Sequence, residues 1–140
     1  MLDLINAVLY SVSLCAAVPE VTEDLNREWA GTCVEVAYRA ELRDLDVPIT
    51  LAIAWHESRF NRYAIGSRGE QGPLQAMPRW RRDAEEDVID MGLNAVEHYT
   101  TRFEEMDDAL CWYRGGGGAP CASADRRINW ANRLVAAAEG

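Results

Sequence analysis

The residue with the clearest chemical potential in this sequence is Glu57, which follows the almost purely apolar run PITLAIAW at positions 48–55. Helical spacing places Ile49, Ile53 and Phe60 on the same face as this glutamate. Burial among apolar side chains penalises the charged form of a carboxyl group and raises its pKa, and the negative end of a helix acts in the same direction. A carboxyl group that keeps its proton near neutral pH can protonate a leaving oxygen, as glycosidases require.

The alternative is an ordinary glutamate at a helix end, turned to solvent or paired with Arg59 or Arg62. The sequence HESRF also begins like the zinc-protease motif H-E-x-x-H. Phe60 stands where that motif needs its second histidine, so this interpretation fails.

A metal site is not expected elsewhere either. The four cysteines, at 15, 33, 111 and 121, contain no C-x-x-C pair, and the chain has only two histidines. Tetrahedral zinc sites usually show closer ligand spacing. We predict no metal and no cofactor. Cys111 and Cys121 flank a glycine-rich segment able to close on itself, so they are expected as a disulfide in an oxidising compartment or as free thiols otherwise.

Several helices must position Glu57. Apolar residues recur at helical spacing from Thr22 to about Leu45 and from about Asp83 to Glu105, while Pro48 is suited to open the helix that carries Glu57. A short apolar piece, ALCWY, precedes four consecutive glycines, and a last helix follows Ser123.

The segment AIGSRGEQGPLQAMP at 64–78 breaks this helical pattern with three glycines and two prolines, which predicts turns or a short hairpin. The expected fold class is therefore mainly α, with a small β-hairpin or irregular element directly after the helix that bears Glu57. Histidine 56 lies beside the acid but about 100° away around the helix, so we interpret it as structural.

The composition is that of one globular domain of 140 residues, with 49% hydrophobic and 26% charged residues. A net charge of -9 argues against general nucleic-acid binding, which needs basic surface to neutralise phosphates. We predict no nucleic-acid partner, and the oligomeric state is left open.

The N-terminal residues 1–20 form an apolar run followed by small residues and a proline. Two alternatives stay open for them: a signal-like segment, although Asp3 replaces the usual positive start, or an amphipathic or buried first helix. The run is expected to be too short to span a membrane, so no stable membrane anchor is predicted.

Three motifs in order resemble the soluble lytic transglycosylase family. The sequence ESRFNRYAIGSRGEQGPLQAMP, at 57–78, is similar to the family signature, in which a Glu-Ser pair ending a buried helix precedes a glycine-bearing turn and a G-L-M-Q-x-M-P-like segment. IDMG at 89–92 falls where the family has an N-I-x-x-G helix start, and ALCWYRGG at 109–116 resembles its A-L-A-A-Y-N-A-G motif. The resemblance covers roughly residues 30–116.

The departures from the family pattern are specific. Val88 and Arg114 each replace an asparagine, Pro73-Leu74 stands for Leu-Met, and Gly66-Ser67 replaces the serine usual at the first of these positions. Arg114 is expected to alter the floor of the cleft.

The resemblance implies a lysozyme-like fold over 21–140 and the glycan strands of peptidoglycan as partner. It implies cleavage of the β-1,4 bond between N-acetylmuramic acid and N-acetylglucosamine, with Glu57 first protonating the glycosidic oxygen. The same residue then takes the proton from the muramyl C6 hydroxyl, which closes onto C1 and yields a 1,6-anhydro sugar without water. Ordinary glycosidases need two carboxylates for their chemistry.

The remaining site residues follow from the same resemblance. Tyr113 would lie against Glu57 as the second catalytic residue. The residues expected to line the sugar-binding cleft are Ser58, Gly72, Gln75, Met77 and Arg114. Core packing is the alternative for Tyr113 and Met77, and a local helix-end hydrogen bond is the alternative for Ser58. The cluster Arg79–Arg82 is expected either to meet stem-peptide carboxylates or sugar rings, or to be a solvated helix start.

Two other functions are kept open. One is a goose-type lysozyme-like hydrolase that uses water in place of the muramyl hydroxyl. The other is a catalytically silent domain that binds glycan or forms part of a virion. The expected location is the periplasm or extracytoplasmic cell wall, or a phage virion or endolysin.

Overall fold

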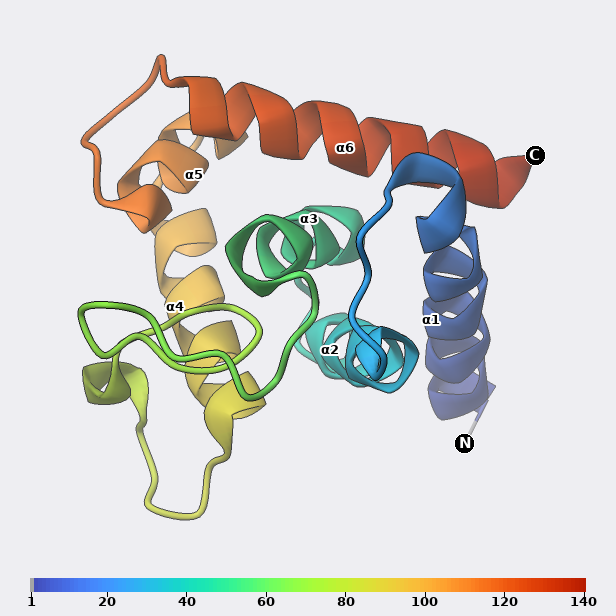
Figure 1. Cartoon of the computed structure of the whole chain (residues 1–140), viewed down its shortest axis with the longest axis horizontal. Helices are drawn as coiled ribbons and strands as arrows, with labels where there is room; N and C mark the ends of the chain where they lie inside the picture. Colours follow the sequence, from blue (N-terminus) through green and yellow to red (C-terminus); the bar gives the residue numbers. More distant parts are fainter. Residues whose placement is uncertain (1) are drawn as a thin grey trace.

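The structure, a computed structural model, describes residues 2–140 and is mainly helical (Figure 1). The elements in chain order are α1 (Leu2–Val21), α2 (Trp29–Leu42), α3 (Val47–Ser58), the short 3-10 helix η1 (Pro78–Trp80), α4 (Val88–Arg102), α5 (Met106–Arg114) and α6 (Ala122–Glu139). The coarse helical class predicted from the sequence is therefore confirmed.

Helix α3 lies at the centre of the molecule, between α6 and α2 (Figure 1). Its residues Val47 and Ile49–Ala54 are buried, because an apolar helix of this kind is stable only where neighbours cover it on several sides. The Asp46 side chain caps its start by accepting a hydrogen bond from the Ile49 N–H at 3.0 Å. Pro48 sits in the first turn, as its position in the sequence predicted.

The predicted small β-hairpin is wrong for the residues that the structure describes. Residues 64–78 form turns joined by two isolated bridges, one between Ile65 and Gln71 and one between Gln71 and Ala76. Positive φ angles at Gly69, Gly72 and Gln75 turn the backbone too often for a ladder to extend. The irregular alternative is the one observed, and this segment is called the 64–78 loop below.

Two helices begin later than their apolar spacing predicts. Residues 22–28 stay outside α2, because the Asn26 side chain accepts from the Glu28 N–H and donates to the Arg59 carbonyl. Asp87 caps α4 by accepting from the N–H groups of Ile89 and Asp90, so the polar residues before it remain in a loop.

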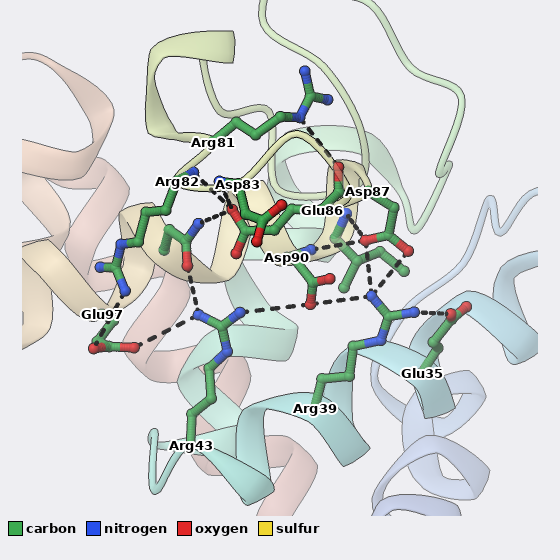
Figure 2. Close-up of polar contacts among 12 residues, drawn as sticks. Glu35, Arg39, Arg43, Arg81, Arg82, Asp83, Glu86, Asp87, Asp90 and Glu97 are labelled. Atoms are coloured by element: carbon green, nitrogen blue, oxygen red, sulfur yellow. Dashed lines mark hydrogen bonds and ion pairs between the residues drawn. The ribbon is translucent and has the colours of Figure 1, made fainter.

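The helices α2 and α4 are joined by a network of arginines and carboxylates, which Figure 2 shows. Arg39 of α2 pairs with Asp87 at 2.8 Å and Asp90 at 3.2 Å, and also with Glu35. Arg43 reaches Asp90 at 3.5 Å, together with Glu97 and Asn94. Each of these two arginines thus faces at least two carboxylates, and we call this set the α2–α4 network.

Two disulfides cross-link the helices. Cys111 of α5 is bonded to Cys121, the residue before α6, which is one of the two alternatives raised for this pair. Cys15 of α1 is bonded to Cys33 of α2, a pairing that the sequence did not suggest. All four cysteines are therefore oxidised.

Helix α1 packs along α2 and α6, burying Leu14, Ala17 and Val18. Its 19-residue stretch Asp3–Val21 is long and apolar enough to cross a membrane by length and composition, and 33% of its most apolar window is buried inside the protein. The expectation that this segment is too short to span is therefore wrong. Buried core helices and signal sequences meet the same criterion, so both alternatives for residues 1–20 stay predictions.

Candidate active site

Glu57 lies in the last turn of α3, with 16% of its side chain exposed. One carboxylate oxygen is 3.4 Å from Nη2 of Arg127 on α6. Burial is the largest influence on the Glu57 carboxyl group and raises its pKa; Arg127 and Arg114 oppose the rise, while Glu70 adds to it. The net direction is upward, so burial outweighs the two arginines. Glu57 is therefore not the solvated glutamate of the alternative interpretation.

The backbone directly after this acid is unusual. Arg59 ends α3 in the left-handed conformation at φ 56°, and Phe60 follows at φ 61°. Consecutive left-handed residues that are not glycine carry strain, which persists only where the surroundings impose it. Here the fully buried Phe60 ring packs against Trp29 and Trp130 and fixes the turn.

A groove of about 620 Å³ opens beside Glu57. Aromatic rings from three elements form much of its wall: Trp80 of η1, Tyr99 of α4, and Trp112 and Tyr113 of α5. Its other lining residues are Ser67, Arg68, Glu70, Gln75, Ala76, Met77, Arg79, Ala95, Arg114, Gly115 and Gly116. A groove with aromatic walls and polar edges is suited to sugar rings, which have apolar faces and polar rims.

Four of the predicted residues, besides Glu57, lie on this groove: Gln75, Met77, Tyr113 and Arg114. The Gln75 side-chain amide donates to the carbonyls of Ala64 and Gly72 at 3.1 and 3.0 Å, so it also holds the 64–78 loop together. Arg114 lies at the C-terminal end of α5, exposed to solvent.

Tyr113 donates its hydroxyl hydrogen to the Leu74 carbonyl at 2.7 Å, and this bond ties α5 to the 64–78 loop. Burial raises the pKa of the tyrosine, and the nearby charge of Glu57 adds to the rise. The Tyr113 hydroxyl therefore stays protonated. The charge of Glu57 affects its pKa, but its hydrogen bond is made to the 64–78 loop and not to Glu57.

Ser58 and Gly72 are not among the groove-lining residues. The Ser58 hydroxyl lies 3.1 Å from the Ala54 carbonyl and accepts from the Asn61 N–H, which is the local helix-end arrangement raised as its alternative, and it also lies 2.8 Å from the Pro73 carbonyl of the loop. Gly72, at φ 81°, lies so close to α4 that a Cβ would come within 2.7 Å of the Val88 side chain. Both residues therefore seat the loop against the helices.

The residues of the cluster Arg79–Arg82 fall into two pairs with different surroundings. Trp80 and Arg79 line the groove, with the Trp80 ring packed 4.8 Å from the His98 ring. Arg81 donates to the Glu86 carbonyl, and Arg82 pairs with Glu97 at 3.9 Å (Figure 2).

Sequence reasoning missed Arg127, which is only 4% exposed. A signal for it was present, because Arg127 falls in the helical stripe formed by Ala124, Ala131 and Leu134, all buried. A charged residue in an apolar stripe was the same feature that identified Glu57.

The groups of histidine, cysteine and acidic side chains needed to hold a metal ion do not occur within residues 2–140. Comparisons of the chain with protein-family models, curated proteins and solved structures found no match. The resemblance to lytic transglycosylases therefore depends on the motif residues alone.

Proposed function

We propose that this protein is a lytic transglycosylase that cleaves the β-1,4 bond between N-acetylmuramic acid and N-acetylglucosamine in peptidoglycan. The observation that carries the proposal is the position of Glu57, a partly buried carboxyl group with a raised pKa at the edge of an aromatic groove. Such a group supplies the proton that a departing glycosidic oxygen needs.

One carboxyl group is sufficient for the proposed reaction. Glu57 gives its proton to the glycosidic oxygen as the bond to C1 of muramic acid breaks. The resulting carboxylate then takes the proton of the C6 hydroxyl as that oxygen bonds to C1. Glu57 ends the cycle protonated, the product is a 1,6-anhydro sugar, and no water is consumed. Tyr113 supports this arrangement by holding the 64–78 loop, which forms part of the groove.

A lysozyme-like hydrolase is the second candidate, and Glu70 is the observation that favours it. Glu70 lines the same groove, and its charge is felt at Glu57. Hydrolysing glycosidases use a second carboxylate to activate water or to act as nucleophile. One Glu70 oxygen already accepts from the Arg68 N–H at 2.8 Å, which fixes the carboxylate in the loop.

A location outside the reducing cytoplasm accords with the proposal. Disulfides persist in secreted, periplasmic and virion proteins, and both disulfides here join structural elements of the domain. We therefore propose the periplasm, the extracytoplasmic cell wall or a phage particle as its place of action, with glycan strands as its partner.

Mass analysis of purified peptidoglycan after digestion tests the proposal. The wild type is expected to release muropeptides one water lighter than hydrolysis products, and Glu57→Gln is expected to release none. Glu70→Gln is the matched control and should leave the anhydro products in place. Reducing-end products that disappear with Glu70→Gln would instead establish the hydrolase. No product from the wild type across pH and salt would favour a silent glycan-binding or virion domain.

A further inference from the structure

A second hollow, of about 410 Å³, adjoins the groove on the side of α6. We call this hollow the arginine pocket. Its lining residues are Trp55, His56, Glu57, Arg59, Arg114, Arg126 and Arg127. Four arginines thus meet one carboxylate, on a protein whose net charge is -9. Glu57 and Arg114 belong to both hollows, so the pocket and the groove meet at the acid.

The positive charge of this pocket is largely unneutralised. Arg127 pairs with Glu57, but Arg59, Arg114 and Arg126 form no ion pair with any acidic side chain of residues 2–140. The arginines also repel one another, since Arg114 and Arg126 both lower the pKa of Arg127. A hollow lined by like charges and apolar walls concentrates its field and attracts an anion.

Arg59 is held in place in this pocket, and two buried donors there lack a partner within residues 2–140. The Arg59 guanidinium lies 4.1 Å from the centre of the Trp55 ring and donates to the Trp55 carbonyl. The buried Nε of Arg127 and the indole nitrogen of Trp55 have no hydrogen-bond partner among the described residues. Buried donors of this kind are rare in proteins and call for an explanation.

His56 adds a neutral wall. Its Nδ1 lies 2.7 Å from the Ala52 carbonyl, and burial, together with Arg127, Arg59 and Arg126, lowers its pKa to about 4. The imidazole is therefore uncharged at neutral pH and adds no repulsion to the arginines.

The position of the pocket indicates what would enter it. If a glycan strand lies with its scissile bond at Glu57, the arginine pocket borders the sugars next to that bond, because it shares Glu57 and Arg114 with the groove. Muramic acid carries a lactyl-linked peptide, and the chemical groups of that peptide that suit arginines are its carboxylates.

We propose that the arginine pocket binds a carboxylate of the peptide attached to muramic acid, and that it thereby selects peptide-bearing strands over bare glycan. This inference rests on the proposed function. The cluster Arg79–Arg82, which the sequence offered for this role, is less suited to it. Arg82 is paired with Glu97 and Arg81 with the Glu86 carbonyl, so within the described residues Arg79 alone of this cluster lines the groove without an ion pair, against three such arginines in the arginine pocket.

The test compares two substrates prepared from one wall sample freed of phosphate polymers: strands with their peptides, and strands from which an amidase has removed them. The variants are Arg126→Gln and Arg59→Gln, and the matched control is Arg27→Gln, an exposed arginine outside both hollows. Each pocket variant is expected to lower kcat/KM on peptide-bearing strands about tenfold, mainly through KM, since a charge-assisted hydrogen bond contributes about that factor. On peptide-free strands, all variants should match the wild type within about twofold.

A third substrate separates charge from bulk. Peptide-bearing strands whose carboxylates have been converted to amides should be cleaved by the wild type no better than peptide-free strands. Equal losses on all substrates, or no loss on any, would overturn the inference while leaving the transglycosylase proposal intact. Failure of the wild type to cleave strands of either kind would instead count against the proposed function. Activity on peptide-free strands also reports that each variant is folded.

Discussion

Two regions of this protein use arginine in opposite ways. In the α2–α4 network, Arg39 and Arg43 each face two or more carboxylates, and the charges cancel locally (Figure 2). In the arginine pocket, four arginines face Glu57 as their only acidic neighbour in the lining. The first arrangement holds two helices together and leaves no field for a ligand. The second keeps an excess of positive charge, which is what recognition of an anion requires.

The largest expected effect separates Glu57 from Glu35, a second glutamate that has arginine partners. Glu57→Gln should reduce turnover of peptidoglycan by about 10³-fold, since a general acid contributes about 10²–10⁴-fold. Glu35, which pairs with Arg39 and with Arg62 at 3.0 Å, is the matched glutamate of the α2–α4 network. Glu35→Gln should leave turnover within about twofold. Equal losses of turnover for Glu57→Gln and Glu35→Gln in steady-state assays would show that the two regions do not differ in function.

The next effect concerns Arg127, the link between Glu57 and the pocket. Arg127→Met should lower the free energy of unfolding by about 3 kcal/mol, because one partner of a largely buried ion pair is removed. Urea denaturation measures this loss.

The same variant should also change the pH dependence of kcat/KM. The acid must be protonated to act, so activity falls as pH rises through the pKa of Glu57. Arg127 opposes the rise of that pKa, so its removal raises the pKa further and moves the fall in activity to higher pH. An unchanged profile would mean that Arg127 does not act on Glu57.

The two disulfides sharpen the comparison further. Cys111–Cys121 joins α5, which ends at Arg114, to the start of α6, which carries Arg126. The Cys111→Ala/Cys121→Ala variant should lose about 2–3 kcal/mol of stability. It should also lose part of the preference for peptide-bearing strands, because the two sides of the pocket are no longer linked.

The Cys15→Ala/Cys33→Ala variant is the control for that experiment. It removes a disulfide between α1 and α2, neither of which lines the pocket, and should lose about 3 kcal/mol in urea denaturation with the preference retained. If it abolishes the preference equally, the effect of the first disulfide is not local.

The smallest effect is expected in the α2–α4 network. Arg39→Gln should cost about 1 kcal/mol of unfolding free energy, since partly exposed ion pairs contribute little and are screened by salt. Activity per folded molecule and substrate preference should not change. If Arg39→Gln lost the preference for peptide-bearing strands, the α2–α4 network and the arginine pocket could no longer be assigned different roles.

The sequence predicted the helical class and a Glu57 shielded from solvent, which the structure shows as a side chain that is 16% exposed. Both predictions depend on the spacing of apolar residues along a single helix. Arg127 also stood in an apolar stripe, but its pairing with Glu57 joins positions 70 residues apart and depends on how α6 packs on α3. The late starts of α2 and α4 escaped prediction because side chains of Asn26 and Asp87 compete for the backbone N–H groups. The prediction of a hairpin was wrong because the sequence around Gln75 gives no local signal of its left-handed conformation.

Helix α6 spans most of the molecule, from the loop after α5 to the flank of α1 (Figure 1). Its 18 residues make a stiff helix about 27 Å long. The end of this helix near Glu57 bears Arg126 and Arg127, and its far end packs on the N-terminal helix. Because α6 is stiff, we expect the packing of α1 against it to influence the arginine pocket, which α1 does not line. Removing the Cys15–Cys33 bond leaves α1 packed on α6, whereas a protein lacking residues 1–20 loses that support and should show a looser pocket and weaker selection of peptide-bearing strands.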